Sequence, residues 1–336
     1  MLRLDKLTDD QILKLRFSDL PITIEKSLAS RAIKQLYQEI KEKGLRFRPH
    51  VWFSSEWFAP DGIPGIAIPF YLGHPRLLKL EKKIMLEAEG ESYKECMKIL
   101  RHEAGHAVDN AFRLYRKKKF REIFGSYSQK YPDEYRPKPN SRRFVLHLDS
   151  WYAQAHPAED FAETFAVWLT PGYRWRQRYK DWPALDKLVY VDQLMVEIKD
   201  KKPIVSSKKT SDSIDKLKQS LESHYQARKL QYSSDRSGSY DRDLRRIFSA
   251  DPAHYRRKSA AKFIRESRAE LRQLVSDSTG TPPYCIDQLL QDIIQRAKEL
   301  KLVMAESDRE TREKLLLMLV VQTMNVIHHG RYTFAL

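Results

Sequence analysis

The chain of 336 residues carries a formal net charge of +16 and only two cysteines. This length accommodates two domains of ordinary size, each with its own core. Because Cys96 and Cys285 lie far apart, the sequence excludes a disulfide-rich secreted scaffold and predicts a cytoplasmic protein. The first residues lack the apolar core of a signal peptide, and no apolar run is long enough to span a bilayer. We therefore expect no membrane association.

The positive charge is compatible with an anionic partner. However, acidic residues are interleaved with the basic ones nearly throughout the chain. This pattern favours solvated helical surfaces, and no nucleic-acid-binding motif is present. Nucleic acid is therefore not the partner that the sequence favours.

The first part of the chain mixes helices with short strands. Residues 7–20 are expected to form a short amphipathic lead-in, and residues 24–43 a helix. Strands are predicted at 47–53 and 65–72. Pro69 cannot donate to a sheet ladder, so the second strand is expected at an edge. A peptide substrate can add to such an edge as one more strand, or the edge can simply be the margin of the sheet.

The most informative stretch is a helix predicted over residues 92–116, which follows another at 76–87. Apolar residues recur through it at three- and four-residue steps. It contains the sequence His102-Glu103-Ala104-Gly105-His106. Residues four apart lie on one helix face, so both imidazoles can reach one metal ion. Glu103 lies about 100° round the helix, within reach of a water molecule on that metal.

This short pattern also arises by chance, on surface helices that carry two unrelated histidines. Two features favour the metal site. The helix has a strong apolar face, and Ala104 and Gly105 are small. Glycine destabilises a helix by roughly 1 kcal/mol relative to alanine. We therefore expect another element to pack closely against Gly105.

A catalytic zinc ion needs a third protein ligand and an open fourth position. The longer pattern with a third histidine is absent, because Asp109 and Phe112 occupy the positions of its glycine and histidine. A second helix is predicted to begin at Pro157 and to end before residue 171. Glu159, in its first turn, is the expected third ligand, and Asp160 and His156 are the alternatives.

Two further carboxylates are candidates for holding the histidine rings in place. Glu163 lies one turn after Glu159 and is expected to accept the N–H of His102 or His106, which would fix the ring tautomer. Asp109, one turn after His106, is a weaker candidate for the same role.

These residues occur in two motifs, HEAGHAVD at 102–109 and HPAEDFAETF at 156–165. Together they resemble a bacterial family of zinc-binding metallopeptidases. The chain is also similar to the gluzincins, the thermolysin class, and especially to the catalytic domain of anthrax lethal factor, over about residues 20–200. The resemblance implies that the zinc ligands are His102, His106 and Glu159, that Glu103 is the general base, and that Glu163 supports a ligand.

The resemblance also implies a role for Tyr152. In lethal-factor-like enzymes, a tyrosine shortly before the ligand glutamate donates to the transition-state oxyanion, and Tyr152 stands at the matching position. Its local sequence alone is more typical of a packed aromatic residue. The histidine donor of the thermolysin pattern has no recognisable counterpart in this chain.

The remaining sequence predicts a short strand at 144–148 and a helix at 183–199. The polar, basic segment 201–213 is the predicted domain boundary. Helices are expected beyond it at 214–231, 241–275, 286–303 and 309–328. We thus predict an α+β, zincin-like metallopeptidase domain with a small sheet over residues 1–205, and an all-helical, basic domain over 206–336.

The predicted function is zinc-dependent hydrolysis of peptide bonds, with a peptide or protein as substrate that lies along the edge over residues 65–72. Two alternatives use the same residues. One is a non-catalytic, zinc-stabilised scaffold whose basic half binds nucleic acid or an acidic protein. The other is a small-molecule amidase in which the helical half acts as a lid.

Overall fold

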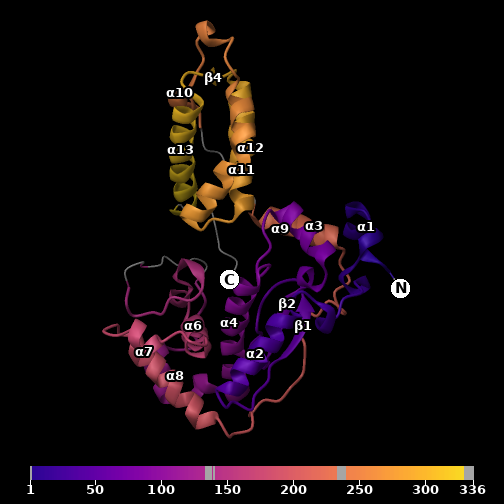
Figure 1. The fold of residues 1–336 in the computed structure, drawn as a ribbon, viewed down its shortest axis with the longest axis vertical. Coiled ribbons are helices and arrows are strands. Elements are labelled where there is room, and N and C mark those ends of the chain that lie inside the picture. The colour runs from indigo at the N-terminus through magenta and orange to yellow at the C-terminus, as the bar shows by residue number, and fades with distance from the viewer. Residues whose placement is uncertain (1, 133–137, 139–140, 233–239, 329–336) are drawn as a thin grey trace. The chain divides into compact units, whose positions relative to one another are not determined.

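The computed structural model describes residues 2–132, 138, 141–232 and 240–328, and it divides the chain into two compact units (Figure 1). The first unit comprises residues 1–82 and 88–224, and the second comprises residues 83–87 and 225–336. None of the described helices combines the length and the apolar character needed to cross a membrane.

Helices predominate in the first 224 residues. In chain order, the helices and strands there are α1 (Asp9–Leu13), α2 (Ser30–Glu42), β1 (His50–Ser54), β2 (Gly65–Pro69), α3 (Pro75–Met85), α4 (Tyr93–Phe112), α5 (Lys118–Phe124), α6 (Pro157–Leu169), α7 (Trp175–Arg178) and α8 (Ala184–Ile198). The predicted helix at 24–43 is shorter than expected, because residues 24–26 form a separate 3-10 turn before α2.

The sheet of the first unit consists of two short parallel strands. β1 pairs with β2 from His50 opposite Gly65 to Ser54 opposite Pro69. The strand predicted at 144–148 is not formed. Backbone N–H groups of this segment bond to side chains instead of to a neighbouring strand. Leu146 N–H donates to the hydroxyl of Tyr179, and Leu148 N–H donates to the carboxylate of Glu163.

The second edge of β2 is not open to a peptide. Ala67 N–H donates to the carbonyl of Phe58 at 2.8 Å, in an antiparallel bridge. Gly65 N–H donates to the carbonyl of Ile63 at 2.9 Å, and Pro69 has no N–H to offer. The N–H groups of β2 that face away from β1 are therefore either already hydrogen-bonded or, at Pro69, absent. The prediction that a substrate adds to the edge over 65–72 is wrong.

A buried ion pair fixes α4 against α2. Arg101 donates two hydrogen bonds to the carboxylate of Glu39, at 2.7 and 2.8 Å. The Glu39 side chain is only 2% exposed. Such a two-point contact between planar groups restricts orientation as well as distance. Because Arg101 immediately precedes His102, the pair sets the rotation of α4 at the start of the histidine motif.

α4 and α6 pack directly against each other at Gly105. A Cβ atom on Gly105 would lie 2.8 Å from the Cα of Ala162 and 3.1 Å from its carbonyl oxygen. The close packing predicted at this glycine is confirmed. Both contact atoms belong to the backbone of α6, so a rotamer change cannot relieve the clash that a side chain would create.

The segment after α8 stays with the first unit. Val205 N–H donates to the carbonyl of Ala111, and Ile214 N–H donates to that of Phe53, both at 3.0 Å. The compact unit accordingly extends to His224, whereas the sequence predicted a boundary near 205. The polar composition of residues 201–213 misled the prediction, because their backbone groups are hydrogen-bonded to the first unit, as where Trp52 and Ser54 donate to the carbonyls of Ser211 and Asp212.

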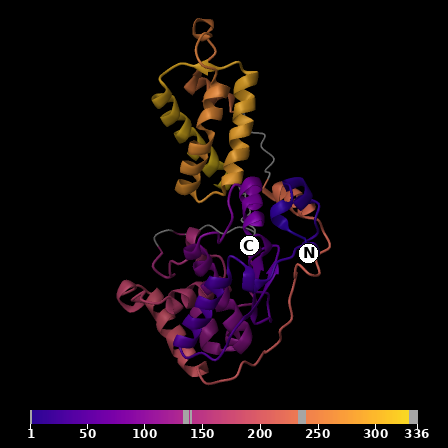
Figure 2. The same cartoon turned by 45° about the vertical axis from the view of Figure 1, so that its right-hand side comes forward.

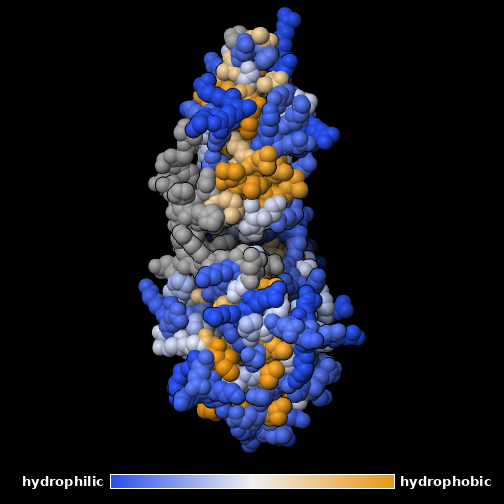
Figure 3. All heavy atoms as spheres, turned by 90° about the vertical axis from the view of Figure 1, so that its left-hand side faces the viewer, coloured by the Kyte–Doolittle hydropathy of each residue, from blue (hydrophilic) through white to orange (hydrophobic). Residues whose placement is uncertain are grey.

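The second unit contains most of α9 (Leu221–Tyr232), followed by α10 (Asp241–Ile247), β3 (Phe248–Ser249), α11 (Ala260–Thr279), α12 (Pro283–Glu299), β4 (Val303–Met304) and α13 (Asp308–His328). Helices α11, α12 and α13 lie side by side around an apolar core that includes Phe263, Leu290 and Leu315 (Figure 2). Figure 3 shows a mainly hydrophilic face, with apolar side chains gathered on the second unit.

Two predictions for the second unit need correction. The helix expected over 241–275 is interrupted by β3 and by Pro252, which cannot continue a helix. β3 also pairs antiparallel with β4, Phe248 opposite Met304, so the unit is not all-helical.

We expect Gly105→Ala to lower the free energy of unfolding by about 1–3 kcal/mol, because the added methyl group overpacks the contact between the helices. At an unconstrained helical position the same change stabilises a protein by roughly 1 kcal/mol. Urea denaturation of wild type and Gly105→Ala therefore shows by the sign of the change in unfolding free energy whether position 105 is tightly packed. A more stable Gly105→Ala protein would show that α4 and α6 do not approach as closely as described.

Candidate metal centre

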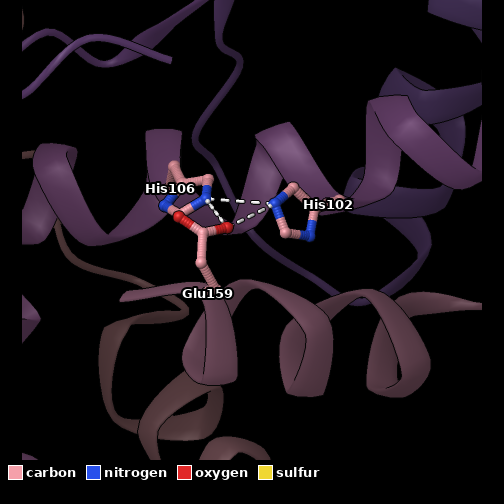
Figure 4. A group of neighbouring side chains, drawn as sticks. All are labelled: His102, His106 and Glu159. Atoms are coloured by element: carbon pink, nitrogen blue, oxygen red, sulfur yellow. Dashed lines mark hydrogen bonds and ion pairs between the residues drawn. The ribbon is translucent and has the colours of Figure 1, made fainter. Parts of the chain in front are cut away.

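The two histidines of the motif point the same way from α4. His102 Nε2 lies 3.1 Å from His106 Nε2, and the ring centroids are 4.9 Å apart (Figure 4). Their side chains are only 3% and 11% exposed. The four-residue spacing on one helix therefore places two nitrogen donors side by side in a largely buried position.

Glu159 approaches the same point from α6. Its Oε2 lies 3.0 Å from His102 Nε2 and 3.2 Å from His106 Nε2. Pro157 occupies the first position of α6, so Glu159 sits in its first turn. Figure 4 shows the carboxylate rising from α6 towards the two rings. These residues are the group in the described part of the chain whose donor atoms converge as metal ligands do.

The three donors fit a zinc ion. Zinc takes two imidazole nitrogens and one carboxylate oxygen in many catalytic sites, and tetrahedral bonds of about 2.0–2.2 Å place its donors roughly 3.3–3.6 Å apart. The separations of 3.0–3.2 Å seen here need to widen by only a few tenths of an ångström. A bound cation would take the place of the ring protons, because neutral imidazoles present their Nε2 lone pairs, and the carboxylate then needs another positive charge beside it.

The titration behaviour of the triad reflects this crowding. Burial alone would raise the pKa of Glu159, but His106 and His102 outweigh it and hold that pKa well below its ordinary value. Burial would likewise lower the pKa of His102, yet Glu159 and Glu163 hold it well above its ordinary value. A buried carboxylate thus stays ionised only because positive charge lies beside it, and a divalent cation supplies such charge.

Glu163 binds the ring nitrogen of His102 that points away from the triad. Its Oε1 accepts the Nδ1–H of His102 at 2.8 Å, and its Oε2 accepts the N–H of Leu148 at 2.9 Å. The proton on Nδ1 leaves the Nε2 lone pair free to face the triad, which is how carboxylates orient metal-binding histidines. The sequence left open whether Glu163 binds His102 or His106, and the ring that it binds is that of His102.

Asp109 is engaged elsewhere. Its Oδ1 accepts the N–H of Tyr115 at 2.8 Å, just beyond the end of α4, and no hydrogen bond joins it to either ring among the described residues. The hydrogen bond to a histidine ring considered for Asp109 is therefore not formed in the described part of the chain. Its carboxylate instead ties the 3-10 turn at Leu114–Arg116 back to α4.

The two alternative third ligands also point away from the triad. His156 caps α6, since its Nδ1 accepts the N–H of Ala158 at 3.1 Å while its Nε2 donates to the carbonyl of Gln129 at 2.8 Å. Asp160 pairs with Lys187 of α8 at 2.5 Å. Burial raises the pKa of Asp160 to about 7, although Lys187 opposes the shift. The geometry therefore favours Glu159 over both.

Glu103 is buried next to the triad, with 8% of its surface exposed. Burial raises its pKa above the ordinary value, although the neighbouring His102 and His106 act in the opposite direction. A carboxylate in such a setting binds a proton more readily than one in water.

Tyr152 lies beside His102. The two ring centroids are 5.6 Å apart, and Tyr152 belongs to a short 3-10 segment that leads into α6. The preceding Trp151 has a φ of +54°, in the left-handed region that bulky residues rarely occupy. A strained backbone next to a polar cluster is a common feature of functional sites.

Sequence reasoning missed Tyr131. Its hydroxyl donates to Glu159 Oε1 at 2.8 Å, and its ring stacks on His156 with centroids 3.8 Å apart. Tyr131 lies in an irregular segment with no periodic pattern, well before α6. Nothing in the spacing of the motifs indicates that it reaches the triad.

Comparison with known proteins agrees with this geometry. Residues 79–171 match the model of a family described as a putative zinc-binding metallo-peptidase. The match covers less than a third of the chain. It contains the triad together with Glu103, Tyr131, Tyr152 and Glu163. No curated protein and no solved structure gives a significant match to the chain.

We expect Glu163→Gln to weaken zinc binding by roughly 10- to 100-fold, as loss of such supporting carboxylates usually does. A neutral amide holds His102 less firmly in the tautomer that presents Nε2. Competition with a zinc chelator measures the change. Asp160→Asn is the matched control, because it neutralises another buried carboxylate of α6 that bonds to Lys187 instead of the triad. Equal losses of affinity in the two variants would contradict the role given to Glu163.

Proposed function

We propose that the first unit is a zinc-dependent metallopeptidase of the gluzincin type. The observation that supports this most is the convergence of His102, His106 and Glu159 beside the buried Glu103. The match of residues 79–171 to a metallopeptidase family supports it independently. Two histidines from one helix and a glutamate from a second helix form the donor set of the thermolysin class and of the lethal factor catalytic domain. The unit would be a reduced zincin-like domain with only a short sheet.

In this proposal the triad would hold zinc, and the bound ion would supply a Lewis acid that polarises a carbonyl and makes water more acidic. Glu103 is the general base. Its carboxylate takes a proton from the attacking water and passes it to the leaving amine. Its raised pKa brings it nearer to the pH at which both transfers are efficient.

Tyr152 would stabilise the charge that develops on the scissile carbonyl oxygen. Its ring lies next to His102, and in this proposal its hydroxyl group reaches a substrate bound at the triad. A neutral donor suits this role, because it binds an oxyanion more strongly than the carbonyl from which the oxyanion forms.

The proposed substrate is a peptide or an extended protein segment. It cannot lie along β2 as an added strand, because Phe58 already pairs with Ala67 there. The substrate would instead be held near the triad by residues of the matched segment, 79–171, that lie outside the sheet. This places specificity in loops rather than in a strand edge.

Glu103→Gln should retain one zinc ion per chain and lose peptide hydrolysis, because glutamine keeps the shape of the side chain but cannot accept the proton. Metal analysis and a peptide-library cleavage screen, run on the same preparations, test this. Persistent cleavage by the zinc-loaded Glu103→Gln protein would rule out the mechanism. Wild-type protein that holds zinc but cleaves no peptide would instead favour a structural zinc site.

Tyr152→Phe should lower kcat by about 100-fold with little change in KM, since the hydroxyl is assigned to a contact made mainly in the transition state. Zinc affinity should be unchanged, because Tyr152 is not a ligand in this account. Steady-state kinetics on a peptide found in the screen give both constants. A change confined to KM would show that Tyr152 binds the substrate rather than the oxyanion.

A further inference from the structure

Glu159 uses its two carboxylate oxygens for different partners. Oε2 faces the nitrogens of His102 and His106, whereas Oε1 accepts the hydroxyl hydrogen of Tyr131 at 2.8 Å. A carboxylate can bind a metal through one oxygen or through both. A hydrogen-bond partner on Oε1 keeps that oxygen from binding a metal ion and leaves Oε2 as the metal ligand.

Stacking on the imidazole of His156 orients the ring of Tyr131. The two ring centroids are 3.8 Å apart and the planes lie at 14°. His156 is itself fixed at both nitrogens, by Ala158 N–H on one side and the carbonyl of Gln129 on the other. The same histidine therefore caps α6 and orients the tyrosine that bonds to the first turn of α6.

The exposure of the two partners makes this contact unusual. Tyr131 is 40% exposed, while the Glu159 side chain that it bonds is only 6% exposed. Ordering an exposed side chain costs conformational entropy, and both the stacking on His156 and the hydrogen bond to the buried Glu159 offset that cost. Its neighbour Tyr127 differs, because the Tyr127 hydroxyl bonds to the carboxylate of Asp61 at 3.3 Å rather than to the triad.

We propose that Tyr131 is a positioning residue for the metal site. It occupies one oxygen of Glu159 so that the carboxylate binds the metal through the other oxygen alone. This inference rests on the proposed function, since it assumes that the triad binds zinc. It assigns Tyr131 no contact with substrate. Its effect is on metal affinity and coordination number, which can be measured without any catalytic assay.

The test compares wild type with Tyr131→Phe, which removes the hydroxyl but keeps the ring that stacks on His156. Tyr127→Phe is the matched control, because it removes a hydroxyl from the same segment without touching the triad. Zinc affinity is measured by chelator competition. Cobalt(II) replaces zinc in a second measurement, because its visible bands weaken as the coordination number increases.

We expect Tyr131→Phe to bind zinc roughly tenfold more weakly than wild type, the lower end of the range for partners of metal ligands. Its cobalt(II) bands should be weaker, because both oxygens of Glu159 can then reach the metal. Tyr127→Phe should match wild type in both measurements. If Tyr131→Phe and Tyr127→Phe behave alike while wild type binds zinc, the inference is wrong and the proposed function stands. If wild type itself binds neither metal, both fail.

Discussion

The structure depends on how closely α4 and α6 approach each other. The backbone of Ala162 leaves no room for a side chain at position 105, so glycine is the residue that permits the contact. Without it, the first turn of α6 would move away from the histidines and Glu159 would lose its distances of 3.0 and 3.2 Å. The glycine lowers the stability of α4 as an isolated helix, and the packing of α6 offsets that loss.

The residues around the triad each restrict the position, orientation or tautomer of a proposed ligand. Arg101 and Glu39 set the rotation of α4, and Glu163 fixes the tautomer of His102. Tyr131 holds the outer oxygen of Glu159. These contacts come from four separate parts of the chain, which explains how a domain with only a short sheet can position a buried polar cluster. Each contact also satisfies a polar group that would be costly to bury alone.

The sequence predicted those features that depend on local periodicity. α4 and α6 follow from their apolar spacing and end signals, and the four-residue step then places His102 and His106 on one face. Features that depend on long-range backbone contacts were not predictable. The Phe58–Ala67 bridge closes the edge of β2, and Val205 joins a polar segment to the first unit. The side-chain contact of Tyr131 with Glu159 was not predictable either, because no pattern connects an irregular segment to a helix that begins 26 residues later.

The central claim is that Glu159 completes a zinc site with the two histidines. The most direct test is the zinc content of purified wild-type protein beside Glu159→Ala, with circular dichroism to verify that both are folded. Wild-type protein should hold one zinc ion per chain, and the folded Glu159→Ala protein should lose most of its zinc. Equal zinc content and affinity in the two proteins, or a wild-type protein that takes up no zinc, would contradict it.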